Sequence, residues 1–240
     1  MSTENKPVLG RRRFLTRAAT VSAAALAGSS LLTPTFSWAV SPALTYANIP
    51  GTGDVKVLNY ALALEALETD LYKQAIQRLT NGGRNALGRQ IVGLGLNANS
   101  PDVQYLREFA QVELQHRTFL DTALGSASLL RSAPFNNAKF DFRMETLSRR
   151  QVVELVYTAE KTGVGAYLGA IPLFATRNYL QAAGAIQGTE ARHTATVAIV
   201  LNKLFRAGLN TAPLANQNNG IDAPIAPDTV LASVSPFIVL

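Results

Sequence analysis

The sequence predicts an all-α fold, in which four long helices form a bundle that a long, mostly irregular C-terminal tail follows. Three observations predict this fold class. Apolar residues recur at three- and four-residue spacing through four stretches of the chain, which is the period of a helix with one buried face. Residues that begin and end helices stand between these stretches. With 240 residues, 48% of them hydrophobic, the chain can bury one sizeable core.

The bundle is expected to span residues 54–208 and to begin with two helices at residues 54–80 and 101–124. Asp54 is expected to cap the first helix, because an Asp side chain accepts hydrogen bonds from the free backbone amides of a first turn. Pro101 suits the first position of the second helix, where a missing backbone N–H costs no hydrogen bond.

Two further helices are expected at residues 148–170 and at residues 178–207. Pro172 ends or kinks the earlier of the two, because proline lacks the amide that a helix interior needs. Gly208 closes the later one. Three glycines lower the helix propensity of the third segment, so we expect them to serve close helix packing or to leave space near a site. They are Gly163, Gly165 and Gly169.

The segments between and around these helices are rich in turn-forming residues. Residues 40–53 are expected to be an irregular lead-in, and residues 84–99 to be weakly structured or to hold short helical turns. The connection at residues 126–146 is long for a turn, so it runs along the bundle or covers one end. The proline-rich tail at residues 209–240 is expected to pack on the bundle as extended segments.

Residues 1–39 have the features of a twin-arginine signal peptide. Arg11-Arg12-Arg13-Phe14-Leu15 resembles the export motif, a modestly apolar run follows at residues 18–32, and Ser37-Trp38-Ala39 is a small-x-small cleavage site. An uncleaved anchor helix is the alternative, although the apolar run is short for a membrane span. We therefore expect recognition by the twin-arginine export machinery, a periplasmic or secreted mature protein, and no stable membrane span after cleavage.

Most of the net charge of +6 comes from this leader. Residues 40–240 hold 17 basic and 15 acidic side chains, which argues against a nucleic-acid partner. The chain has no cysteine, which excludes disulfides, thiolate metal sites and iron–sulfur clusters.

The strongest functional signal is a repeated Glu-x-x-His pattern that uses both histidines of the chain. The two copies are Glu113 with His116 and Glu190 with His193, each within a predicted helix. Residues three apart lie on the same helix face, with about 5–6 Å between their Cβ atoms. Each pair can therefore present a carboxylate and an imidazole to one metal ion.

The other two predicted helices each place a glutamate on their apolar face, Glu65 in the first and Glu160 in the third. Two helices that each give a Glu and two that each give a Glu-x-x-His pair match the plan of a carboxylate-bridged site for two metal ions. Ionised carboxylates in an apolar core are costly unless they are paired or bind a metal. Glu68 is an alternative to Glu65 as the ligand from the first helix.

Four segments resemble the ferritin-like superfamily, and in particular the ferritin-like domain family that includes desiccation-related proteins. They are VLNYALALEALETDLYKQAI (57–76), DVQYLREFAQVELQHRTFL (102–120), YTAEKTGVGAYLGAI (157–171) and AIQGTEARHTATV (185–197). The tail at residues 221–239 is also similar to that family's C-terminal end. The spacing from Glu65 to Tyr72 is similar to the pattern in ferritins and rubrerythrins, which favours Glu65 over Glu68.

The resemblance implies two iron or manganese ions at Glu65, Glu113, His116, Glu160, Glu190 and His193, with no catalytic residue beyond these ligands. It also implies chemistry on O₂ or hydrogen peroxide in stress protection, of the ferroxidase, peroxidase or catalase kind. Two alternatives are a non-enzymatic stress or desiccation protein and a mineral-storing cage, for which the sequence shows no acidic lining. Tyr72, Tyr157 and Tyr167 are expected on or near the inner faces, as hydrogen-bonding core residues or as groups that tune the site. Whether the chain forms a homo-oligomer stays open.

Overall fold

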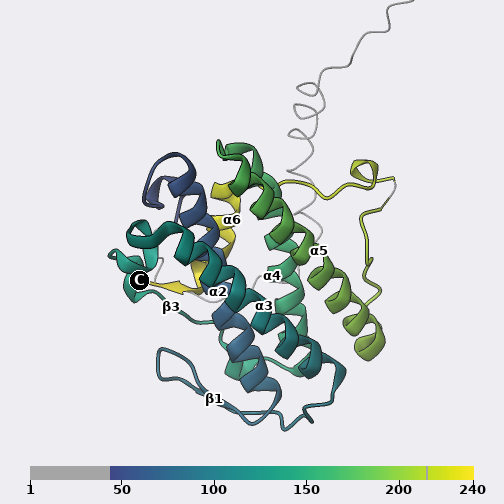
Figure 1. The fold of residues 1–240 in the computed structure, drawn as a ribbon. Coiled ribbons are helices and arrows are strands. Elements are labelled where there is room, and N and C mark those ends of the chain that lie inside the picture. Colours follow the sequence, from purple (N-terminus) through teal and green to yellow (C-terminus); the bar gives the residue numbers. More distant parts are fainter. Residues whose placement is uncertain (1–43, 215) are drawn as a thin grey trace, which may run out of the picture.

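A computed structural model describes residues 44–214 and 216–240. Four long helices lie side by side in it (Figure 1), and they confirm the predicted all-α bundle. Their bounds are α2 (Gly53–Leu79), α3 (Pro101–Leu124), α4 (Arg149–Ala170) and α5 (Arg177–Phe205). A short helix, α6 (Pro227–Val234), lies in the tail. The expected signal peptide at residues 1–39 falls outside the described residues.

The buried apolar residues form two clusters, one toward each end of the bundle. On α2, Leu64 belongs to the first cluster and Ala66 to the second. On α5, Ile186 belongs to the first and Val197 to the second. The predicted ligand Glu65 lies between the members on α2, and the second Glu-x-x-His pair lies between those on α5. The polar residues of the bundle interior are therefore enclosed by apolar packing on both sides.

A buried ion pair ties together the N-terminal ends of α3 and α4. Asp102 is fully buried and accepts two hydrogen bonds from the guanidinium of Arg149, at 2.8 and 2.9 Å. This bidentate geometry fixes two helix starts that are 47 residues apart in sequence.

The prediction that Asp54 caps its own helix is wrong, because Thr52 occupies the N-cap position of α2. The Asp54 carboxylate instead accepts hydrogen bonds from the backbone amides of Ala175 at 2.7 Å and Thr176 at 3.0 Å, at the start of α5. A carboxylate that accepts hydrogen bonds from the first amides of a helix is the usual cap interaction, and here a side chain of one helix provides it for another.

The segment after α2, expected to be weakly structured or to hold short helical turns, is mostly turn and coil and contains a small hairpin in place of helical turns. Strand β1 (Gly83–Arg84) pairs antiparallel with β2 (Gln90–Ile91). The backbone at Gly82 has a φ of +79°, and a Cβ there would lie 2.5 Å from the carbonyl oxygen of Ile91. Only glycine fits this close approach.

The long connection between α3 and α4 holds short helical turns and one strand, β3 (Lys139–Phe140), which pairs antiparallel with β4 (Ile238–Val239) at the end of the tail. The 3₁₀ turns of the described chain are η2 (Tyr46–Asn48), η3 (Gly125–Ala127), η4 (Leu129–Arg131), η5 (Phe135–Asn137), η6 (Met144–Thr146), η7 (Ile171–Leu173), η8 (Asn218–Gly220) and η9 (Ser235–Phe237).

The tail contacts the bundle, and α6 makes it less extended than the prolines indicate. The backbone amide of Ile225 donates to the carbonyl of Gly165 on α4, at 2.9 Å. A Cβ on Gly165 would lie 2.5 Å from the Ile225 side chain, and one on Gly169 would overlap the Ile225 carbonyl oxygen. Two of the three glycines of this helix therefore serve close packing. The α5 helix ends two residues earlier than predicted, with Arg206 in the left-handed conformation as its C-cap.

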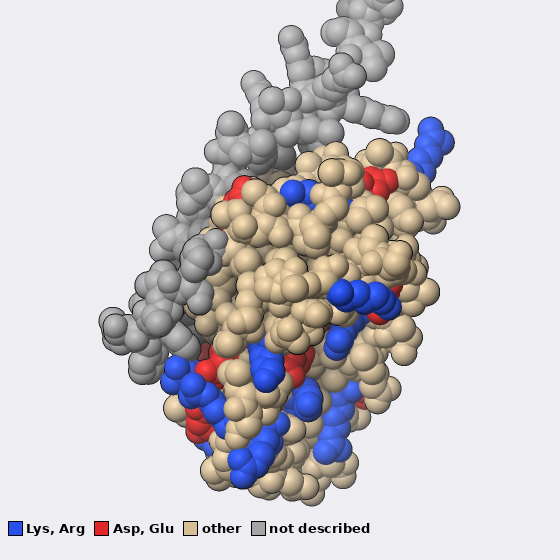
Figure 2. Space-filling model, turned by 90° about the vertical axis from the view of Figure 1, so that its left-hand side faces the viewer, with Lys and Arg blue, Asp and Glu red and all other residues tan. Residues whose placement is uncertain are grey.

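Basic side chains gather toward one end of the face in Figure 2, with acidic side chains among them. Ion pairs join several opposite charges of the described chain, such as Arg89 with Asp141 at 3.4 Å and Arg150 with Glu154 at 2.7 Å. Within the described ranges, none of the helices has the length and apolar character that crossing a membrane requires.

Candidate metal centre

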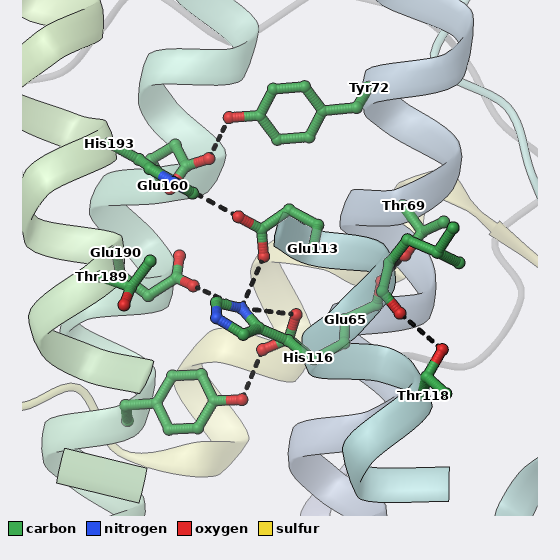
Figure 3. Close-up of polar contacts among 12 residues, drawn as sticks. Glu65, Thr69, Tyr72, Glu113, His116, Thr118, Glu160, Thr189, Glu190 and His193 are labelled. Atoms are coloured by element: carbon green, nitrogen blue, oxygen red, sulfur yellow. Dashed lines mark hydrogen bonds and ion pairs between the residues drawn. The ribbon is translucent and has the colours of Figure 1, made fainter. Parts of the chain in front are cut away.

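The six predicted ligands converge between the two apolar clusters, and each of the four long helices contributes at least one (Figure 3). The helix positions explain the convergence. A spacing of three residues within α3 and within α5 puts each Glu and His on the inner face. All four glutamates of this set are 0% exposed: Glu65, Glu113, Glu160 and Glu190.

Glu113 lies at the middle of the cluster and faces both histidines. Its Oε2 atom is 2.9 Å from Nδ1 of His116, and its Oε1 atom is 2.8 Å from Nδ1 of His193. One carboxylate therefore spans the two imidazoles, as the dashed lines in Figure 3 show.

The remaining glutamates divide between the two histidines. Nδ1 of His116 lies 3.5 Å from Glu65 and 3.6 Å from Glu190. Nδ1 of His193 lies 3.4 Å from Glu160. The donor atoms form two groups whose members lie within 4.8 Å of one another, and Glu113 belongs to both: Glu65, Glu113, His116 and Glu190; and Glu113, Glu160 and His193.

Both imidazole rings are held in place. The ring of His193 stacks on Phe109 of α3, with 3.9 Å between centroids and 17° between planes. The sequence places Phe109 on the inner stripe but carries no local sign of this stacking, because the two residues come from different helices. His116 is the more accessible of the two, with 12% of its side chain exposed against 4% for His193.

Two buried tyrosines donate hydrogen bonds to the outer glutamates, each across to another helix. Tyr72 on α2 donates to Glu160 on α4, and Tyr167 on α4 donates to Glu65 on α2. Each tyrosine follows the glutamate of its own helix by seven residues, so the sequence contains this symmetry. Tyr157, in contrast, is half-buried and makes no hydrogen bond with the cluster within the described part of the chain.

Several donor atoms of the cluster are buried and make no well-aligned hydrogen bond with the described residues, although most of them lie 2.8–3.6 Å from an oppositely charged group of the cluster. They are Glu65 Oε2, Glu113 Oε1, Glu160 Oε2, both carboxylate oxygens of Glu190, and His193 Nδ1. Leaving such atoms unsatisfied in an apolar interior costs free energy, about 1–3 kcal/mol for each and more for charged groups. Oxygen and imidazole donors that point at shared positions fit hard or borderline metal ions, so these residues could hold metal ions.

The crowding of like charges perturbs the pKa of most groups in the cluster. Burial raises the pKa of Glu65 to about 7, and burial with the charge of Glu160 raises that of Glu190 well above its usual value. Burial also opposes ionisation of Glu113, but its contacts with both histidines outweigh burial and lower its pKa to about 2.

The pKa values of the two histidines are raised, whereas those of most buried imidazoles are lowered. Burial lowers the pKa of a histidine, but contacts with Glu113 and Glu65 raise that of His116 to about 10. Contacts with Glu113 and Glu160 likewise raise the pKa of His193 to about 9. Without a metal, the protons on these rings are the positive charges that balance the carboxylates.

Glu68, the alternative ligand of the first helix, lies next to the cluster but outside both groups. The geometry therefore favours Glu65, whose Oε2 faces His116. Gly163 of α4 faces this region, because a Cβ there would lie 2.7 Å from Oε2 of Glu190. The sequence leaves open whether this glycine serves close packing or leaves space, and the structure shows that it leaves space for carboxylates.

Comparisons with known proteins agree with this architecture. A family model described as the ferritin-like domain matches residues 53–203, which include the six clustered residues and nearly all of the four long helices. Searches of curated proteins and of solved structures give no match. Because the matched span covers more than half of the 240 residues, the chain belongs to the ferritin-like domain family.

Proposed function

We propose that this chain is an exported ferritin-like protein that holds two iron or manganese ions at the six residues of the cluster. The observation that carries the proposal is the position of Glu113, whose two oxygens face two different histidines at 2.9 and 2.8 Å. A carboxylate that belongs to two donor groups is the feature expected of a bridge between two ions.

The donor set favours iron or manganese over softer metals, because it combines carboxylates with imidazole and contains no sulfur. When bound, two such ions supply two-electron redox chemistry toward O₂ or hydrogen peroxide. We therefore propose oxidant or iron handling, as a ferroxidase, a peroxidase or a catalase-like enzyme, in protection against stress such as desiccation.

The protein's own residues supply geometry and exclusion of water. Glu65 and Glu160 would each hold one ion, and the hydroxyls of Tyr167 and Tyr72 orient these two carboxylates. Phe109 fixes the plane of the His193 ring. The apolar clusters on both sides keep bulk water from the donors, which strengthens their electrostatic attraction to a cation.

Metal analysis and two activity assays test the proposal. Protein from its native compartment, or reconstituted with Fe²⁺ or Mn²⁺, is expected to hold about two ions for each chain, as the plan of a two-ion site implies. It should also accelerate Fe²⁺ oxidation or peroxide decay. The double variant Glu113→Ala/His193→Ala should lose both the ions and the activity. Glu108→Ala, on the exposed face of α3, is the matched control and should retain them.

Three outcomes separate the alternatives. Two bound ions without redox activity would favour a stress protein in which the metal has a structural role. A chain that cannot be loaded, and whose melting temperature does not change with Fe²⁺ or Mn²⁺, would contradict the proposal. Mass spectrometry of the mature N-terminus tests export, since cleavage after Ala39 should leave Val40 as the first residue.

A further inference from the structure

Glu68 is a fifth buried glutamate beside the cluster, and the proposed two-ion centre does not use it. It is 5% exposed and makes no hydrogen bond or ion pair with any described residue. Its electrostatic neighbours are other carboxylates, with Glu65 and Glu160 first among them. A carboxylate buried among like charges is costly unless a cation accompanies it.

Gly163 creates the space that Glu68 faces. A Cβ on residue 163 would lie 3.4 Å from Oε1 of Glu68 and 2.7 Å from Oε2 of Glu190. One carboxylate from α2 and one from α5 therefore meet over the backbone of α4. Any larger residue at position 163 would push into the Glu190 carboxylate.

Glu190 has a free oxygen directed at this space. Its Oε1 atom faces His116, a member of the first donor group, at 3.6 Å. Its Oε2 atom, which faces Gly163, is buried and has no hydrogen-bond partner among the described residues. The two oxygens of Glu190 thus face different groups. Oε1 faces His116 of the centre, and Oε2 faces the space between Gly163 and Glu68.

We propose that Glu68 and the Oε2 atom of Glu190 form a third cation position, beside the two-ion centre and in the space that Gly163 leaves. This inference rests on the proposed function, because Glu190 would be shared between the two places. The occupant is a hard divalent cation such as Fe²⁺ or Mn²⁺, which binds carboxylate oxygens and completes its shell with water. With two protein ligands, the position holds its ion more weakly than the centre does.

Titration with Mn²⁺ tests the third position, with chelator-treated full-length protein and the six-line electron paramagnetic resonance signal of free Mn²⁺ as readout. The wild-type chain is expected to bind three ions, two tightly and one more weakly. Glu68→Gln should keep the two tight ions and lose the weak one. Glu68→Asp keeps the charge on a shorter side chain and should weaken the third ion without abolishing it.

Glu108→Gln makes the same charge change on the exposed face of α3 and should leave three ions bound. Circular dichroism checks that each variant is folded. Equal stoichiometry in wild type and Glu68→Gln would overturn the third position while the two-ion centre stands. Loss of a tight ion in Glu68→Gln would also overturn it, by making Glu68 a ligand of the centre. A wild-type chain that binds no Mn²⁺ tightly would contradict both proposals.

Discussion

The residues of the cluster show how a helix positions charged groups in an apolar interior. Four glutamates at 0% exposure have few uncharged partners, and the Tyr72 and Tyr167 hydroxyls supply two of them. Each tyrosine bonds a glutamate on another helix, so the hydrogen bond also fixes how α2 and α4 lie against each other.

Removing one hydroxyl should destabilise the metal-free protein. Tyr167→Phe leaves the Glu65 oxygen without its donor, and Tyr72→Phe does the same for Glu160. The expected loss is about 1–3 kcal/mol of unfolding free energy for each, measured by urea denaturation at neutral pH. Tyr157→Phe is the matched control and should change the free energy by less than about 0.5 kcal/mol. A loss at Tyr157 as large as at Tyr167 would contradict this account.

Much of the site at this scale is predictable from the sequence. Helical spacing shows that Glu65, Glu113, Glu160 and Glu190 point inward, and the chain has only two histidines. The crossed pairing of tyrosines and glutamates is not predictable from spacing alone, because it depends on which helices are neighbours. The stacking of Phe109 on His193 and the approach of Glu68 to Glu190 have the same limitation.

At the scale of elements, local rules predict the helices well and their mutual contacts poorly. The stripes of apolar residues predict four helices to within a few residues of their ends. Asp54 does accept hydrogen bonds from backbone amides at a helix start, but the helix is α5 and not its own helix α2. Helix α6 has eight residues, which is too short for its periodicity to stand out among the prolines around it.

The close contact between α4 and the tail predicts that a larger residue at Gly169 destabilises the protein. Gly169→Ala would drive a methyl group into the Ile225 carbonyl oxygen, so it should destabilise the protein by about 1–3 kcal/mol. Gly184→Ala adds the same methyl to α5, where nothing lies within 4 Å of it. That control should be neutral or stabilising by up to about 1 kcal/mol, because alanine favours helix more than glycine. Thermal or urea unfolding compares the two, and equal effects would contradict the packing role.

At the scale of the whole molecule, the buried charges link stability to pH and to metal. The pKa of Glu65 is raised to about 7, that of His193 to about 9 and that of His116 to about 10. Between pH 4.5 and 10, the folded metal-free chain therefore binds more protons than the unfolded chain does, and its stability falls as the pH rises. Glu113 acts in the opposite sense, but only between its lowered pKa of about 2 and its usual value of 4.5.

The melting temperature of chelator-treated protein should therefore drop between about pH 6 and pH 10. The histidines of the unfolded chain lose their protons near the usual pKa of 6.5, whereas the raised pKa values of about 9 for His193 and about 10 for His116 keep these rings protonated in the folded chain. Each kcal/mol lost lowers it by about 2–4 °C in a chain of this size. Loading with Mn²⁺ should remove most of the drop, since the ion replaces the protons and binds more tightly as the pH rises. Differential scanning calorimetry at three pH values checks this, and a melting temperature that rises with pH in the metal-free protein would refute it.

The C-terminal tail is part of the folded domain, although the family match ends before it. The family match stops at residue 203, yet Ile225 covers the glycines of α4, and β4 supplies the partner of β3. A chain cut at residue 203 would keep every predicted ligand, but it would expose core residues that Val230 and Leu231 of α6 contact and would leave the edge of β3 unpaired. Both changes promote aggregation, so a shortened version is a poor choice for biochemistry.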